Sequence, residues 1–189
     1  MPSVGVLLDC VNMKPPEHIE TERLVLRIPS LADAEAIFNS YAQDSEVTRY
    51  LIWRPHRNIE ETKSSLADCA VAWEGEVRFP YVITFKENGA VIGMIEIRID
   101  DFKADVGYVL SRPNWGKGLA TEALRSLVAW ALGQESIYRV WALCDVENLA
   151  SGRVLEKAGM QREGVLRRQS VHPNISDEPR DCYCYAAAR

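Results

Sequence analysis

The sequence is poor in histidine, a common metal ligand. It has only three histidines, and none of them stands near a cysteine at the spacing of a zinc site. Its five cysteines are odd in number and irregular in spacing. We therefore expect no metal and no disulfide framework, with free thiols as in a reducing compartment.

Long apolar runs and an excess of positive charge are also missing. No stretch approaches the ~20 apolar residues of a membrane span. The short apolar run from Val4 to Leu8 has no basic segment before it and makes a poor secretion signal. We expect a cytoplasmic protein without a membrane partner. The net charge of −5 argues against nucleic acid as a partner; it fits a positively charged amine and plain solubility equally well.

What is present indicates one folded domain. The chain has 189 residues, of which 47% are hydrophobic and 26% charged, and this is typical of a globular protein with its own core. No internal repeat or low-complexity tract interrupts it. We expect residues 1–17 to be a loosely ordered N-terminal extension or an overlong start, and residues 18–189 to form a single domain.

The hydrophobic pattern predicts a strand, two helices, three strands, a helix, a strand, a helix and two strands. The strands are expected at 23–28, 80–86, 91–99, 105–110, 138–144, 160–168 and 181–187. The helices are expected around 37–41, after Asn58, at 117–132 and at 148–159. Hairpins in the first half and a strand–helix–strand unit in the middle predict an α+β fold with a mixed sheet.

Two glycines mark the junction between the third hairpin strand and its helix. Gly116 and Gly118 let the backbone turn sharply, and the first turn of the helix then offers free N–H groups and a positive dipole end. That combination suits an anion such as a pyrophosphate. Taken alone it is weak evidence, because many helices begin this way without a ligand. The spacing matches neither the P-loop nor the dinucleotide fingerprint.

The stretch Trp115-Gly-Lys-Gly-Leu-Ala-Thr-Glu-Ala-Leu124 resembles the acetyl-CoA pyrophosphate loop of the GNAT acyltransferase superfamily. Trp115 stands where Gln or Arg is usual. That departure resembles the branch of ribosomal-protein N-terminal (alanine) acetyltransferases, as do the blocks at 21–27, 148–160 and 181–185. The resemblance covers residues 19–187. It implies an N-acetyltransferase domain with a mixed, mostly antiparallel sheet, a splayed central strand pair and flanking helices.

The same resemblance implies acetyl-CoA as co-substrate, no metal, and a binding site made mostly of main chain. A backbone N–H near Val109 is expected to stabilise the oxyanion of the tetrahedral intermediate. The residues expected to bind the cofactor are Val109, Leu110, Ser111, Trp115, Gly116, Lys117, Gly118, Leu119, Ala120, Thr121 and Asn148.

The expected catalytic residues are less sharply defined. Asp105 is the leading base, at the place where some relatives carry a catalytic Glu, although an ordinary ion-pairing role fits it too. Glu96 on the adjacent strand is the second candidate. The usual tyrosine acid would fall near Leu155, so Ser151 replaces it as acid, or merely caps its helix. Relatives pair this serine with an acidic residue that would fall near Ser170 here.

The function implied is acetyl transfer to a primary amine by direct attack in a ternary complex. An α-amine, with a pKa of about 7.7–8.0 against about 10.4 for lysine, needs little help from a base. A protein N-terminus, such as that of a ribosomal protein, is therefore the expected acceptor. Small amines (polyamine, amino acid or aminoglycoside) and a non-catalytic coenzyme A sensor remain open, as does monomer or homodimer. The segments 48–57 and 172–180 should decide the acceptor.

We expect Cys144 to be core rather than an acyl carrier, because no histidine lies near it in sequence.

Overall fold

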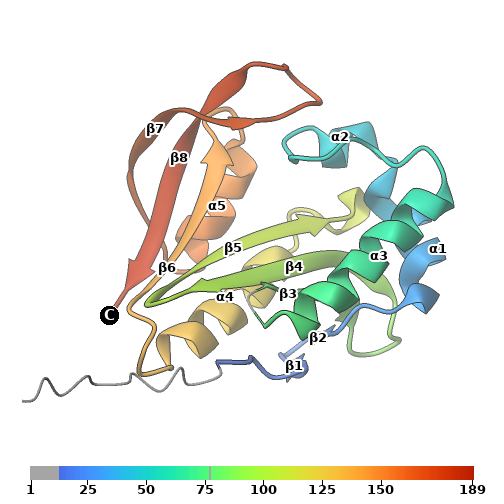
Figure 1. The fold of residues 1–189 in the computed structure, drawn as a ribbon, viewed down its shortest axis with the longest axis horizontal. Helices are drawn as coiled ribbons and strands as arrows, with labels where there is room; N and C mark the ends of the chain where they lie inside the picture. Colours follow the sequence, from blue (N-terminus) through green and yellow to red (C-terminus); the bar gives the residue numbers. More distant parts are fainter. Residues whose placement is uncertain (1–12, 77) are drawn as a thin grey trace, which may run out of the picture.

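The computed structural model describes residues 13–76 and 78–189, so the first twelve residues of the expected extension lie outside it. One eight-stranded sheet runs through the molecule in the order β1-β2-β3-β4-β5-β6-β8-β7 (Figure 1). Every neighbouring pair is antiparallel except β5 and β6, which are parallel. The α+β fold with a mixed, mostly antiparallel sheet is confirmed.

The strands are β1 (His18–Glu20), β2 (Leu24–Arg27), β3 (Arg78–Phe85), β4 (Val91–Asp100), β5 (Lys103–Leu110), β6 (Arg139–Asp145), β7 (Gln161–Val171) and β8 (Pro179–Ala188). The α-helices are α1 (Ala34–Ile37), α2 (Ser45–Thr48), α3 (Ile59–Glu74), α4 (Leu119–Leu132) and α5 (Leu149–Lys157). Short 3-10 turns, η1 (Leu31–Asp33) and η3 (Arg112–Asn114), and a π turn, η2 (Phe38–Ala42), complete the description.

The seven strands and four helices expected from the hydrophobic pattern are all found. The Asn58 side chain accepts from the Glu61 N–H and caps α3, as its position predicts. Two short elements, β1 and α2, are absent from the prediction. Neither is long enough to show a periodicity, and α2 depends on the Asp44 side chain, which accepts from Glu46 N–H and Val47 N–H.

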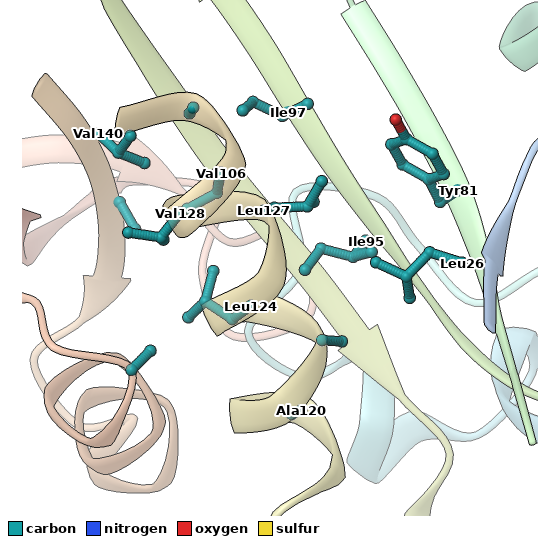
Figure 2. Packing of buried hydrophobic residues seen from close by; sticks show 14 of the residues in the cluster. Leu26, Tyr81, Ile95, Ile97, Val106, Ala120, Leu124, Leu127, Val128 and Val140 are labelled. Carbon is teal, nitrogen blue, oxygen red and sulfur yellow. The ribbon is translucent and has the colours of Figure 1, made fainter. Parts of the chain in front are cut away.

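The sheet has two covered faces, because side chains alternate along each strand. On the α4 face, Leu124, Leu127 and Val128 pack toward Ile95 and other sheet residues (Figure 2). Full burial of a leucine contributes about 1.5–3 kcal/mol, so this cluster is the main source of stability. On the α3 face a smaller cluster joins Tyr41, Leu66 and Val82.

The central parallel pair separates soon after it forms. β5 and β6 share only the pairs Lys103↔Arg139, Ala104↔Val140 and Asp105↔Trp141. Beyond that point β5 stays with β4, whereas β6 pairs along its whole length with β8. Figure 1 shows the two strands diverging from a common origin. This is the splayed strand pair that the resemblance implied.

Residues 13–17, which belong to the expected extension, are described and touch the domain. The Tyr81 hydroxyl donates to the Pro16 carbonyl at 2.8 Å, and Met13 packs against the larger core cluster. In the described part of the chain, every helix is too short or too polar to cross a membrane.

Candidate active site

A cleft of about 780 Å³ opens where β5 and β6 diverge. Its walls come from β4, β5, β6, the α3 side of the sheet and the start of α5. Because side chains alternate along a strand, residues from both faces of the sheet border the gap. Val106 and Cys144 belong to the cluster on the α4 face, whereas Val109 and Met94 pack against the cluster on the α3 face. A ligand lying in the gap would therefore be reachable from both faces of the sheet.

The sheet register decides which backbone groups of β5 face the gap. The Ser111 N–H donates to the Ile92 carbonyl, and the pairing continues through Leu110↔Gly93 and Val109↔Met94. In an antiparallel ladder alternate residues point their backbone groups to the same neighbour. Val109 and Ser111 thus bond toward β4, while Tyr108 and Leu110 point theirs toward the gap. The Val109 carbonyl oxygen points at Gly93 of β4 so closely that a Cβ added to Gly93 would lie only 2.2 Å from it, which agrees with this assignment.

The glycine turn before α4 has the geometry that its sequence suggests. Gly116 and Gly118 both have left-handed φ values, 74° and 76°. Trp115 donates its indole N–H to the Leu110 carbonyl at 2.6 Å, which ties the turn to the end of β5. The first N–H groups of an α-helix have no partner within the helix, so this turn presents donors at a positive dipole end.

A clamp from β2 holds the first turn of α4 in place. Arg23 donates to the Lys117 carbonyl at 3.0 Å and to the Glu122 carboxylate at 2.7 Å. Glu122 also accepts from the Thr21 hydroxyl and the Arg23 backbone N–H. Burial opposes the ionisation of Glu122, but these hydrogen bonds outweigh it and lower the pKa of the carboxyl. Sequence reasoning missed Arg23 and Glu122 as parts of the site because they meet only across 99 residues of chain.

Of the residues expected to bind the cofactor, Val109 and Asn148 line the cleft, whereas Leu110, Ser111 and residues 115–121 lie outside its lining. Leu119, Ala120 and Thr121 form the buried first turn of α4. Asn148 lines the cleft, and its side chain accepts from the Ser151 N–H at 3.1 Å, so it caps α5. Ser111 is buried, and its hydroxyl accepts from the Asn114 side chain.

The two expected bases, Asp105 and Glu96, both line the cleft on the α3 face. Each is paired with arginine. Asp105 accepts from Arg98 Nε at 2.8 Å, and Glu96 lies 3.4 Å from Arg78 Nε and 3.6 Å from Arg98 Nη1. Burial raises the pKa of Glu96, although both arginines oppose the shift. Arg98 stands directly opposite Asp105 across the β4–β5 pair, which explains the ion pair.

Ser151 meets a hydroxyl that the sequence did not point to. The Tyr108 hydroxyl and Ser151 Oγ lie 3.0 Å apart, and both residues line the cleft. Burial raises the pKa of Tyr108, so the phenol keeps its proton at neutral pH. Tyr108 could have been found from strand alternation, since it shares the face of Val106 and points toward α5.

A second group of polar residues lies on the β6–β8 side of the cleft. His172 Nε2 is 3.7 Å from Asp145 Oδ2 and 3.8 Å from Cys182 Sγ. All three line the cleft. Sequence reasoning named His172 only as the start of a segment expected to decide the acceptor, and it gave none of the three a catalytic role. Nearby Cys144 is buried, as expected. Burial raises the pKa of its thiol to about 12, which makes it a poor nucleophile at neutral pH.

Two loops meet beside the cleft. The Asn174 side chain donates to the carbonyls of Thr48 and Trp53, at 2.7 Å and 2.8 Å. Arg54 donates to the Pro173 carbonyl at 2.8 Å. We call these contacts between segments 48–57 and 172–178 the bridge. Figure 1 shows the β7–β8 loop reaching toward α2.

The chain matches known acetyltransferases in sequence. Residues 23–161 match the family described as an acetyltransferase (GNAT) domain. An uncharacterised N-acetyltransferase of Bacillus licheniformis, p20, is 33% identical over 156 residues, which are 80% of this chain and 86% of p20.

Solved structures are similar in fold. A GNAT-family acetyltransferase from Bacillus anthracis has a TM-score of 0.79 and 27% identity, covering 90% of this chain and 98% of that one. RimL, a ribosomal L7/L12 α-N-protein acetyltransferase solved in complex with coenzyme A, has a TM-score of 0.80 and 21% identity, covering 91% and 98%. At the latter identity the likeness shows the fold alone.

Proposed function

Because the chain belongs to the GNAT acetyltransferase family, and is thus an N-acetyltransferase that uses acetyl-CoA, we propose that its acceptor is a protein N-terminal α-amine. The amine attacks the thioester directly in a ternary complex. The observation that carries this acceptor class is the arginine pairing of Asp105 and Glu96 in the wall of the gap between β5 and β6, which begins beyond Asp105.

Acetyl-CoA, the acetyl donor, binds in this proposal through backbone groups and the N-terminus of one helix, α4. The first turn of α4, from Gly116 to Thr121, binds the pyrophosphate of acetyl-CoA through N–H groups. The gap between the strands takes the pantetheine arm beside Val109, Leu110 and Ser111. The register supports the N–H of Leu110 or Tyr108, rather than that of Val109 itself, as donor to the oxyanion.

The class of amine acceptor is inferred from the ion pairs of the two carboxylates in the cleft. Asp105 and Glu96 both carry arginine partners, so neither is a free strong base. At about pH 7.5 deprotonation costs ~4 kcal/mol for a lysine amine and well under 1 kcal/mol for an α-amine. A site of this kind therefore favours an α-amine. The structural neighbour RimL, named for acetylating an α-amine of a ribosomal protein, supports the same class.

Departure of the coenzyme A sulfur is assigned to the paired hydroxyls. Ser151 and Tyr108 share a hydrogen bond in the gap, and either can donate a proton to the leaving thiolate while the other relays it. Because coenzyme A leaves readily as a thiolate, loss of this acid should cost only ~10²-fold in rate.

A small-molecule α-amine is the second candidate, and the bridge is the observation that favours it. The contacts of Asn174 and Arg54 join two loops beside the cleft. A closed bridge leaves less room for the residues that follow a peptide's first amine than for an amino acid derivative.

The test is acetyl-CoA-dependent thiol release against a panel of peptides and small amines, with a blank for the protein's own cysteines. Release with Ala- or Ser-starting peptides, lost when their N-termini are blocked, is the expected result. Release with polyamines or amino sugars alone would move the protein to another acceptor class. Coenzyme A binding without release from any amine would contradict the proposal and favour a sensor.

A further inference from the structure

His172 has an unusual environment for a histidine in the wall of a cleft. It follows the end of β7, is 5% exposed, and lines the cleft beside Asp145 and Cys182. Its Nδ1 is buried and has no hydrogen-bond partner among the described residues. A buried polar atom left unpaired costs about 1–3 kcal/mol, so such an atom in a cleft wall points to a ligand that pairs with it.

The other ring nitrogen faces an anion. Nε2 lies 3.7 Å from the carboxylate of Asp145, whose side chain is fully buried. Burial opposes ionisation of Asp145, but hydrogen bonds from Arg180 and the Glu147 N–H outweigh it and hold the pKa of the carboxyl below its usual value. Asp145 is therefore charged at neutral pH. An anion beside Nε2 favours the tautomer with its hydrogen on that atom, which leaves the lone pair on Nδ1.

The remaining neighbours do not compete for that lone pair. Cys182 Sγ lies 3.8 Å from Nε2, not from Nδ1. Arg180 is bonded to Asp145 and Glu147. Ser170 lines the cleft two residues before His172. By contrast Asp105 and Glu96, the two carboxylates expected to act as bases, are both engaged by Arg98.

We propose that His172, oriented by Asp145, is the general base that takes the proton from the attacking amine, a role that rests on the proposed acetyl transfer. The nitrogen lone pair forms the N–C bond to the acetyl carbonyl carbon, and the C–S bond breaks with its electron pair on the coenzyme A sulfur. The proton lost by the nitrogen goes to Nδ1, and Asp145 stabilises the imidazolium. Ser151 or Tyr108 gives a proton to the leaving thiolate and is reprotonated from the imidazolium through solvent, so the products are an amide and a free thiol.

The first test is His172→Gln in the thiol-release assay with the best acceptor of the panel. General base catalysis is worth about 10²–10⁴-fold, so kcat should fall by that range while the KM for acetyl-CoA stays unchanged. His18→Gln is the matched control, because His18 is exposed on β1, lies outside the cleft lining and, among the described residues, forms its side-chain hydrogen bond with Glu20. It should leave both constants unchanged.

A second measurement separates a proton acceptor from a packing residue. His172→Ala should regain activity when free imidazole is added, in proportion to the imidazole concentration. Asp145 and Cys182, which lie 3.7 Å and 3.8 Å from Nε2, are intact in both variants.

The possible results distinguish failure of this inference from failure of the proposed acetyl transfer. Unchanged kcat in His172→Gln would overturn the inference while leaving acetyl transfer in place. A fall in kcat without imidazole rescue would assign a structural role to His172 and also overturn the inference. If wild-type protein released thiol with no amine at all, the proposed function would fail first and the role of His172 with it.

Discussion

At the scale of single residues, two aromatic side chains carry hydrogen bonds that their sequence neighbours do not suggest. Trp115 stands where the family usually has Gln or Arg. Its indole N–H fastens the glycine turn to the Leu110 carbonyl. Tyr108 brings a phenol from β5 to Ser151 on α5. In both cases the polar atom of a largely apolar side chain forms a hydrogen bond within the site, to the backbone for Trp115 and to a second hydroxyl for Tyr108.

Gly118→Ala tests the turn at this scale. Its φ of 76° is left-handed, and an L-residue pays about 1–2 kcal/mol there. The turn should relax away from the left-handed region and misdirect the first N–H groups of α4. We expect the KM for acetyl-CoA to rise about tenfold with little change in kcat, measured by thiol release.

Gly89→Ala is the matched control for that variant. Gly89 has a φ of 71° in the β3–β4 turn, with nothing within 4 Å of an added Cβ. It should lower thermal stability by a similar amount and leave the KM for acetyl-CoA unchanged. An equal rise of KM in both variants would mean that general loosening, not the turn at α4, controls acetyl-CoA binding.

At the scale of elements, two ion-pair networks attach β2 to its surroundings. Arg23 and Glu122 join the start of β2 to the first turn of α4. Arg27 and Asp33 join the end of β2 to η1, with Arg27 Nη2 2.6 Å from Asp33 Oδ1. The first network lies at the proposed pyrophosphate site, and the second lies away from it, so their loss should have different consequences.

Glu122→Gln should weaken donor binding alone. Loss of the charged partner frees Arg23 and with it the Lys117 carbonyl. We expect the KM for acetyl-CoA to rise about tenfold, equivalent to about 1.4 kcal/mol. Turnover of acetyl-pantetheine, which has no pyrophosphate, should be unaffected. An equal loss with both donors would contradict a role at the pyrophosphate. Arg139→Gln, which breaks the Arg139–Glu163 pair outside the cleft, is the control.

Asp33→Asn should show a pH-dependent loss of stability. Burial opposes ionisation of Asp33, but Arg27 and Ser30 outweigh it and lower the pKa of the carboxyl. The stabilisation is therefore present above the ordinary Asp pKa of about 3.9 and is lost as the pH falls through the lower folded value. We expect the free energy of unfolding to fall by about 1–3 kcal/mol at pH 7. Urea titrations at pH 7, 5 and 3 should show the difference from wild type shrinking; a constant difference would mean that packing, not charge, is lost.

At the scale of the whole molecule, the sheet divides at the β5–β6 gap into two halves that meet again at the bridge. α1 and α3 pack on β4 and β3 in one half, α5 packs on β6, β7 and β8 in the other, and α4 contacts strands of both halves. Beyond the three shared pairs of β5 and β6, the contacts of Asn174 and Arg54 connect the halves on the far side of the cleft. The bridge is thus placed to control which acceptors enter.

Asn174→Ala tests this control. It removes both hydrogen bonds to the carbonyls of Thr48 and Trp53. We expect kcat/KM for tetrapeptide acceptors to rise several-fold relative to amino acid amides, measured by competition between the two. Lys63→Gln, at the exposed Lys63–Glu60 ion pair of α3, which is worth about 0–1 kcal/mol, should leave the ratio unchanged. A ratio unchanged in Asn174→Ala would mean that the bridge does not select the acceptor.

The sequence by itself determined the features that depend on neighbouring residues. Strand alternation, the Asn58 cap, and the left-handed glycines before α4 are all local, so one stretch of chain is enough to predict them. The order of elements then predicted the mixed sheet, and the family resemblance predicted its splayed strand pair. Only the tertiary structure decided the partners within the cleft. Arg98 neutralises Asp105 because of the β4–β5 register, and Tyr108 meets Ser151 across 43 residues. His172 reaches Asp145 because β8 lies between β6 and β7 in the sheet. Such pairs depend on the order and register of the strands in the sheet, which hydrophobic periodicity does not predict.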